Sequence, residues 1–570
     1  MMESSESTAS FLEDAKQHNQ WWDGETGSPS DLTEVTELEP RSDVVNCLKQ
    51  LDREHDGETD GLVYPIYGPT GIGKTTLLLQ IVAALLREDT VAFDPSHRDL
   101  ELVGSIDPRQ VLYIPLEDSL YHLEPSEDAM AALGNVVDYF YTHIAPRTGR
   151  KFILLDDVGA LRLEGEEKQQ LLDLIDDDTS LVVTGIVESE VDMEEVTGSD
   201  EVQVKWARPM LPMKFIDTVQ HGVYNKSVFE DVDSDLASIV ETHRTTSFDE
   251  DNSLISDVRN NLSDATALPD AIEALEDLHY NVLSEADRDG LHEAARRYLQ
   301  KGGLFQRVPD YSVNNELVHS HFLLYLYKEL AQYESIKNPE NLHRLASLAA
   351  SRAGQELKYT DISERLGVDR RTVDTYLSLL DEGLSVSESH DYSLQRYRRT
   401  RLYLRNPRHV VLLSQRQEHF GFESYEPTGR LNHDFEYKLA RTVGFDHAKR
   451  LAYQVEDDFE GEDPQVEYCE TEAGTVDYVL RNDELVLPLV LSYHPHTGES
   501  TSIASEFDPS VGKHPQEDGE DLIDLEYQAP FRFIVTDSLP KDLVKSESLV
   551  IEKDGWKLCY LPYWLFLLIC

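Results

Sequence analysis

The stretch Gly68-Pro69-Thr70-Gly71-Ile72-Gly73-Lys74-Thr75 decides the fold of this chain. Its spacing fits the G-x-x-x-x-G-K-[ST] pattern of a phosphate-binding loop, in which glycines let backbone N–H groups turn toward a phosphate. An apolar run at 62–67 precedes the stretch, and a strongly helical run at 76–86 follows it. This strand–loop–helix context favours a nucleotide-binding loop over a glycine-rich turn that matches by chance.

The same pattern assigns roles to the loop residues. We expect the Lys74 ammonium to reach the β- and γ-phosphates and the Thr75 hydroxyl to bind Mg²⁺, while the helix N-terminus adds its positive dipole end. Pro65 is a mild objection, because a central strand cannot use a residue without an N–H. The cofactors predicted from the sequence are ATP and Mg²⁺. The predicted cofactor-binding residues are Gly68, Pro69, Thr70, Gly71, Ile72, Gly73, Lys74, Thr75 and Thr76.

A second apolar run, 152–155, ends in the carboxylates Asp156 and Asp157. This pattern is typical of a buried parallel strand that delivers acids to the C-terminal edge of a sheet, although surface turns also produce it. We predict that Asp156 binds Mg²⁺, directly or through water, and that Asp157 orients or deprotonates the attacking water. We expect Thr184, on a further strand at 181–185, to hydrogen-bond near the γ-phosphate. Alternating strands and helices predict a parallel sheet covered on both faces.

Length and charge bound the remaining possibilities. A chain of 570 residues has room for three or four domains, and its formal net charge is −58. Since 40% of the residues are hydrophobic, we expect most of the chain to fold rather than to be disordered. The acidity predicts a halophilic, cytoplasmic protein from a cell with high internal salt. In such a proteome an acidic balance no longer argues strongly against nucleic-acid binding.

The scattered cysteines and the chain ends agree with a cytoplasmic location. The four cysteines include no CxxC pair, which suits a reducing compartment. No signal peptide is visible at the acidic, Ser-rich N-terminus, and the apolar run 564–569 is too short to span a bilayer.

The pattern of residues 358–380 predicts a helix-turn-helix motif. A first helix turns at Gly367, and a second begins at Asp369, a plausible N-cap, which leaves Arg370 and Arg371 outside for phosphate or base contacts. An arginine cluster with interleaved tyrosines follows and looks like the wing of a winged helix. We weigh duplex DNA and a protein partner evenly as targets of this region. The candidate DNA-contacting residues are Arg370, Arg371, Arg396, Arg398, Arg399 and Arg401.

The order of these pieces resembles a group of bacterial and archaeal AAA+-type P-loop ATPases. Members join a core and a helical lid to a winged helix and a C-terminal domain similar to restriction endonucleases. The resemblance covers residues from about 39 to 570 and implies ATP use rather than a particular biological role. An arginine often follows the Thr184 strand in this group, whereas this chain has Ser199 there and Arg208 as the next candidate. The motifs that carry the resemblance are 68–75, 154–157, 299–303, 359–362, 372–377, 435–437 and 475–478.

The nuclease-like region departs from the pattern of an active enzyme. Active members need an acid on a helix, an Asp ending one strand, and an E-x-K on the next, all converging on a metal. Here 435–437 resembles the helix motif and Asp477 the strand Asp, but Val490 and Ser492 stand where Glu and Lys would be. We therefore expect a catalytically dead binding platform.

The predicted architecture is multidomain α/β, built on a P-loop NTPase core. The leading functional prediction is an ATPase whose winged helix contacts DNA. The alternative is a non-hydrolysing ATP switch or scaffold that recruits a protein partner. The expected divisions are a disordered acidic tail (1–38), an AAA+-type core (39–214), a helical lid (215–345), a winged helix (346–427) and a degenerate nuclease-like domain (428–570).

Overall fold

The structure is a computed structural model in which the contacts divide the chain into two compact units. The first comprises residues 1–211 with 382–384, and the second residues 212–381 with 385–570. The described residues are 6–23, 32, 35, 41–53, 61–86, 100, 102–121, 123, 128–163, 165–193, 202–220, 254–262, 264, 266–304, 315–392, 399–414, 433–455, 465–471, 474–481, 485–493, 531–553 and 556–570.

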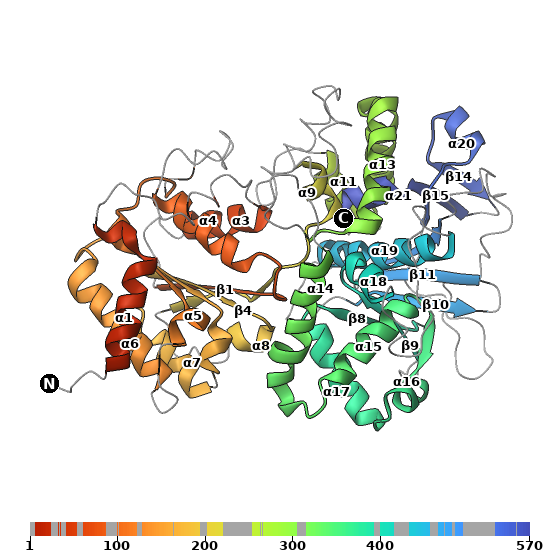
Figure 1. Ribbon diagram of the computed structural model, residues 1–570. Helices are drawn as coiled ribbons and strands as arrows, with labels where there is room; N and C mark the ends of the chain where they lie inside the picture. Colours follow the sequence, from red (N-terminus) through yellow and green to blue (C-terminus); the bar gives the residue numbers. More distant parts are fainter. Residues whose placement is uncertain are drawn as a thin grey trace. The chain divides into compact units, whose positions relative to one another are not determined.

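The first unit is built on a parallel sheet with the strand order β2-β3-β4-β1-β5, and β6 also pairs with β1. Helices α3 and α4 lie on one side of this sheet, and α5, α6 and α7 lie on the other (Figure 1). This layering is the α/β P-loop NTPase fold expected for the core. The strands are β1 (Gly61–Tyr67), β2 (Val111–Pro115), β3 (Lys151–Asp156), β4 (Thr179–Gly185), β5 (Val202–Val204) and β6 (Arg208–Pro209). The helices and short turns are α1 (Glu6–His18), η1 (Gln20–Asp23), α3 (Ser42–Arg53), α4 (Lys74–Leu86), η3 (Pro108–Gln110), α5 (Leu116–Leu120), α6 (Ala129–Tyr139), η4 (Phe140–Ile144), η5 (Val158–Leu161), α7 (Gly165–Leu172) and α8 (Glu188–Val191).

Proline 65 is tolerated in β1 because the ladder is interrupted on one side. Val63 O accepts from Lys205 N at 2.9 Å, and Tyr67 O accepts from Met210 N at 2.7 Å, so both face the β5 and β6 side. Pro65, two residues from each, faces the same side by the alternation of the strand. The gap between β5 and β6 falls there, so no partner carbonyl requires the missing N–H.

Residues 6–23 are ordered, which corrects the expectation of a disordered tail in this part of the chain. Helix α1 buries Phe11 and Ala15 completely, and the indole N–H groups of Trp21 and Trp22 both donate to Val111 O. Asn19 donates to Tyr113 O at 2.7 Å and accepts from Tyr113 N at 2.8 Å. These bonds satisfy backbone groups of β2, the edge strand of the sheet.

The second unit begins with helices and contains two further sheets. The helices and short turns are α9 (Phe215–Gln220), α11 (Leu254–Leu262), α12 (Leu268–Asp277), η7 (Leu278–Val282), α13 (Glu285–Lys301), α14 (Asn315–Leu324), η8 (Tyr325–Glu329), η9 (Leu330–Ser335), α15 (Glu340–Ser351), α16 (Tyr359–Leu366), α17 (Arg370–Glu382), α18 (Pro407–Ser414), α19 (His433–Val455), α20 (Lys541–Ser546) and α21 (Tyr563–Ile569). Gly302 ends α13 with φ 66°, and a Cβ at Gly303 would lie 1.9 Å from Met213 O. The paired glycines of the predicted lid stretch are therefore required by backbone geometry.

A three-stranded antiparallel sheet accompanies the helix pair α16 and α17. Its order is β7-β9-β8, formed by β7 (Glu356–Lys358), β9 (Arg399–Leu404) and β8 (Val386–His390). Gly367 ends α16 in the left-handed region with φ 69°, and Asp369 caps α17 by accepting from Thr372 N at 2.9 Å. The turn and the N-cap lie where the sequence predicts them.

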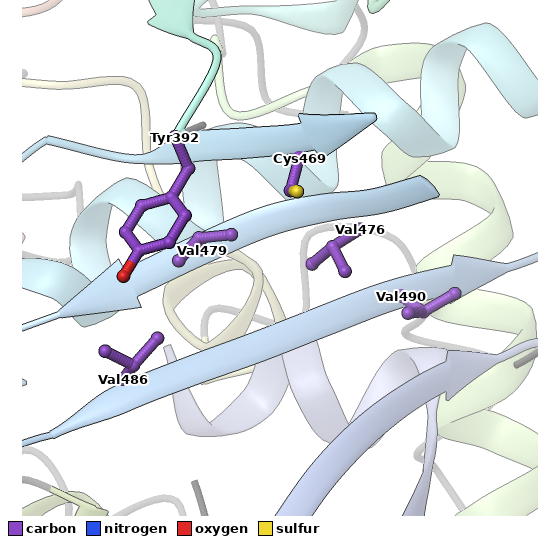
Figure 2. Close-up of a cluster of buried hydrophobic side chains, with 6 residues drawn as sticks. All are labelled: Tyr392, Cys469, Val476, Val479, Val486 and Val490. Atoms are coloured by element: carbon purple, nitrogen blue, oxygen red, sulfur yellow. The ribbon is translucent and has the colours of Figure 1, made fainter. Parts of the chain in front are cut away.

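The C-terminal sheet has six strands in the order β10-β11-β12-β13-β15-β14. Tyr392 N donates to Tyr468 O at 2.7 Å, which joins the end of β8 to β10. Beyond this junction, Tyr392 packs in a buried apolar cluster with Cys469, Val476, Val479, Val486 and Val490 (Figure 2). Within the described residues no helix is long and apolar enough to cross a membrane. The strands are β10 (Glu467–Thr471), β11 (Gly474–Arg481), β12 (Val486–Ser492), β13 (Phe531–Thr536), β14 (Val550–Lys553) and β15 (Trp556–Pro562).

Candidate functional site

The phosphate-loop residues form a tight turn between β1 and α4. Gly71 and Gly73 have φ values of 81° and 106°, which side chains rarely adopt. A Cβ on Gly68 would lie 2.6 Å from Met210 O, so this position also requires glycine. Gly68 N donates to Gly185 O at 3.1 Å, which fixes the loop to the end of the neighbouring strand β4. The backbone therefore requires glycine at these three positions of the loop.

Lys74 opens helix α4 and lies within the loop. Its side chain is buried, and Nζ donates to Gly68 O at 2.6 Å. Thr75, the next residue, is exposed and Thr76 is half-buried. Arg41 braces the loop, because its guanidinium donates to Ile72 O at 3.0 Å and to Leu211 O at 2.5 Å. The sequence analysis missed Arg41, since only the fold brings it to the loop.

Thr184 joins the two predicted acids at the C-terminal edge of the sheet. Its hydroxyl donates to Asp156 Oδ1 at 2.6 Å and accepts from Asp157 N at 2.9 Å. The hydroxyl proton is therefore directed at Asp156, and Thr184 is fully buried. Its hydrogen bond near the γ-phosphate stays a prediction. Asp157 lies in the left-handed region with φ 63° and ψ 63°. Such backbone conformations of non-glycine residues cluster at functional sites.

A third carboxylate, Glu190, lies beside these acids and was missed by the sequence analysis. It is 6% exposed, and its Oε2 accepts from Ile186 N at 2.5 Å. Burial raises the pKa of Glu190 to about 7, against the opposing backbone hydrogen bond, and the charge of Asp157 raises it further. Residue spacing could not have identified Glu190. Its only local pattern is that it lies three residues after Val187, at the start of a short helix.

The donor set at this edge fits a hard divalent cation. Asp156 supplies a carboxylate and Thr75 a hydroxyl, which are the oxygen donors that Mg²⁺ prefers. Among the described residues no group of three or more His, Cys, Asp or Glu side chains is arranged to hold a metal ion by itself.

The predicted DNA-contacting arginines divide into different environments. Arg370 and Arg371 are exposed at the start of α17, and the Arg370 guanidinium lies 5.0 Å from the centre of the Tyr359 ring. Arg399 is half exposed and forms an ion pair with Glu356 at 2.8 Å. Arg396 and Arg398 lie outside the described residues.

Arg401 does not face solvent, which corrects its assignment to a DNA surface. Only 2% of the residue is exposed, and its guanidinium lies 4.0 Å from the centre of the Tyr468 ring. It forms an ion pair with Glu470 at 3.2 Å and approaches Asp477 at 3.8 Å. Tyr403, one of the tyrosines interleaved with these arginines, is fully buried and stacks on Phe445 at 4.1 Å. Residues 400–404 of β9 are all buried and therefore belong to the core of the second unit.

Asp477 is neutralised by arginine rather than arranged for a metal. Arg441 donates to its Oδ1 through Nη2 at 2.6 Å and Nε at 3.2 Å, and Leu491 N donates to its Oδ2 at 2.8 Å. Glu436, the helix acid of the same motif, accepts from the Tyr493 hydroxyl at 3.2 Å. Val490 packs in the apolar cluster of Figure 2 and offers no ligand.

Comparisons with known proteins give three kinds of finding. A family model described as a domain of unknown function, DUF8612, matches residues 292–411. No curated protein matches the chain. Among solved structures, the chain is similar to Orc1 of Aeropyrum pernix in complex with DNA, with 16% identity and a TM-score of 0.27 over 68% of this chain and 93% of that chain.

Two further structures give similar values. For Cdc6p from Pyrobaculum aerophilum the identity is 14% and the TM-score 0.20, over 70% of this chain and 98% of that chain. For Drosophila ORC bound to DNA the identity is 13% and the TM-score 0.21, over 70% of this chain and 99% of that chain. At TM-scores of 0.20–0.27, these similarities carry no information about function.

Proposed function

We propose that this chain binds ATP and hydrolyses it at the C-terminal edge of the parallel sheet. The observation that carries the proposal is the meeting of two features at that edge. One is the glycine-rich loop with Lys74, and the other is the pair Asp156 and Asp157 held by Thr184. The loop is joined to β4 through Gly68 N and Gly185 O, and Thr184 immediately precedes Gly185. Parallel strands bring ligands to this edge in α/β sheets.

The chain's own groups divide the work of hydrolysis. Backbone N–H groups of the loop and the Lys74 ammonium would neutralise the phosphates, which carry most of the negative charge. Asp157 would orient or deprotonate the attacking water. Asp156 and Thr75 would hold Mg²⁺, which when bound supplies further charge neutralisation at the phosphates. Thr184 keeps both acids in place by its two hydrogen bonds.

The experiment compares Lys74→Ala and Asp157→Asn in multimolar KCl. Nucleotide affinity is measured with a fluorescent ATP analogue and turnover by phosphate release. Lys74→Ala should lose at least tenfold in affinity, because the phosphates lose their main cationic partner. Asp157→Asn should bind normally and lose roughly 10²–10⁴-fold in turnover, the usual contribution of a general base. The matched control is Lys16→Ala, a partly exposed lysine on α1.

Two outcomes would contradict separate parts of this proposal. Normal affinity in Lys74→Ala would remove the nucleotide from the loop. Wild-type turnover in Asp157→Asn would leave the nucleotide in place and remove the role of Asp157.

A second proposal concerns α16, α17 and the sheet β7-β9-β8, which together support a winged-helix interpretation. Among the described arginines of the predicted DNA surface, Arg401 is buried, and Arg399 is exposed but paired with Glu356. Arg370 and Arg371 are exposed on α17. The exposed acids Asp369 and Asp374 flank them on α17. This balance of charge favours a protein partner over DNA for this face, in a chain that changes conformation with its nucleotide.

A further inference from the structure

We propose that Glu190 is a positioning residue for ATP hydrolysis, which clamps the turn after β3 against the turn after β4. This inference rests on the proposed ATPase function and deepens it. The first turn carries Asp157, the acid assigned to the attacking water. The second follows Thr184, which holds both acids. Glu190 belongs to α8, which packs against β1, β4 and η5.

Two glycines enclose the Glu190 carboxyl group. A Cβ on Gly159 would lie 1.9 Å from Glu190 Oε1, and a Cβ on Gly185 would lie 2.9 Å from Oε2. Gly159 is two residues after Asp157, and Gly185 directly follows Thr184. Neither glycine has a left-handed φ, so the need for glycine here comes from the approach of the carboxyl group. The carboxyl therefore fills the space between the two turns.

The two carboxyl oxygens have different environments. Oε2 accepts from Ile186 N at 2.5 Å and from Val187 N at 3.4 Å, which fixes the turn after β4. Oε1 is buried against Gly159 without a hydrogen-bond partner among the described residues. A buried polar atom without a partner costs free energy and calls for an explanation. It is the oxygen that faces the turn carrying Asp157.

The charges around Glu190 connect it to the nucleotide site. The carboxylate of Asp157 and the ammonium of Lys74 both act on its charge, in opposite directions. The backbone next to Glu190 is also held by Lys168, whose Nζ donates to Ser189 O and Asp192 O. Burial raises the pKa of Glu190 to about 7, so its side chain is neutral below that pH. Above that pH the side chain ionises and places a second negative charge beside Asp157. Turnover should therefore fall as the pH rises through about 7.

The experiment measures ATP affinity, kcat and thermal stability for Glu190→Ala, Glu190→Gln and Gly159→Ala. The matched control is Glu188→Ala, an exposed glutamate on the same short helix. Glu190→Ala should lower kcat at least tenfold while the ATP affinity stays within about threefold of wild type. Glu190→Gln keeps the shape and neutrality of the clamp, so it should retain kcat within about threefold and lose the fall in turnover above pH 7. Gly159→Ala should lower kcat as Glu190→Ala does, because its methyl group displaces Oε1.

Each other outcome overturns the inference. Equal kcat in Glu190→Ala and Glu188→Ala would show that the clamp has no role in turnover. Equal losses in Glu190→Gln and Glu190→Ala would contradict the neutral clamp. If Glu190→Ala fails to fold, Glu190→Gln and Gly159→Ala decide by the same criteria. A wild type that binds ATP without turnover would contradict the proposed function itself and the Glu190 role with it, whereas normal wild-type turnover limits any failure to Glu190.

Discussion

At the scale of single residues, the surroundings of Asp477 distinguish the second unit from an active nuclease. Asp477 is 3% exposed. Its carboxylate forms an ion pair with Arg441 at 2.6 Å and lies 3.8 Å from the guanidinium of Arg401. Arg441 also donates to Gly354 O at 2.9 Å, so the guanidinium is held from two sides. Burial alone would lower the pKa of Arg441, but the charges of Asp477, Tyr437 and Tyr403, together with the hydrogen bond to Asp477, raise it above its usual range. The position that would bind a metal in an active nuclease is thus used as an internal counter-ion.

We expect Asp477→Ala to destabilise the second unit by roughly 3–5 kcal/mol, because it leaves buried guanidinium groups without their counter-ion. Urea unfolding of the full chain measures the loss. Arg399→Ala is the control, since it breaks the more exposed pair with Glu356 and should cost about 1 kcal/mol or less.

The same proteins serve a second assay. Wild type should show no metal-dependent cleavage of plasmid DNA, because Val490 is buried in an apolar cluster and offers no ligand. Nicking by wild type that disappears in Asp477→Ala would contradict the counter-ion role, as would equal stability of the two variants.

At the scale of elements, the segment formed by α1 and η1 protects an open edge of the first sheet. Strand β2 ends the order β2-β3-β4-β1-β5, and unpaired edge strands invite association with other chains. Asn19 bonds both backbone groups of Tyr113, as a neighbouring strand would. The indole N–H groups of Trp21 and Trp22 both donate to Val111 O. A side chain and two rings thus substitute for a further strand.

Asn19→Ala should therefore destabilise the first unit by about 1–3 kcal/mol, since two buried backbone groups lose their partner. The measurement is the midpoint of urea unfolding, with Lys16→Ala as a control that removes an exposed helix pair with Glu13. A chain lacking residues 1–23 should in addition form larger species in light scattering. Unchanged stability of Asn19→Ala would show that the segment is held by its apolar side chains alone.

Local sequence patterns were enough to predict the elements around the phosphate loop. The loop, its flanking β1 and α4, and the end of β3 lie where spacing and periodicity place them, because each is specified by neighbouring residues. Helix α1 could not be predicted, since Phe11, Trp21 and Trp22 are isolated in an acidic, Ser-rich run and are buried only by elements distant in the sequence, among them α5, α6 and β2. The partners of Arg401 lie about 70 residues later in the chain, so an exposed wing was the simpler reading.

At the scale of the whole molecule, charge limits which polyanions can bind. The formal net charge of −58 repels DNA over the Debye length, about 10 Å at 0.1 M salt and 3 Å at 1 M. Binding to DNA would have to rely on a local face, and α17 offers Arg370 and Arg371 with Asp369 and Asp374 beside them. In concentrated salt the release of counterions contributes little, so direct hydrogen bonds would have to supply the affinity.

The last prediction decides between DNA and protein as the target of α17. We expect Arg370→Ala with Arg371→Ala to change the affinity for a labelled duplex by less than twofold in fluorescence anisotropy, because the flanking acids cancel the two positive charges. Asp374→Ala is the matched variant, since it removes an acid from the same exposed face and should strengthen any DNA binding there. If α17 instead contacts phosphates, the double variant should lose affinity for the duplex. The slope of log affinity against log salt concentration should also become shallower by about 0.9 for each lost contact, or roughly 1.8 in total. That result, with tighter binding by Asp374→Ala, would overturn the protein-docking proposal for this face and restore DNA as its target, while leaving the ATP site of the first unit unaffected.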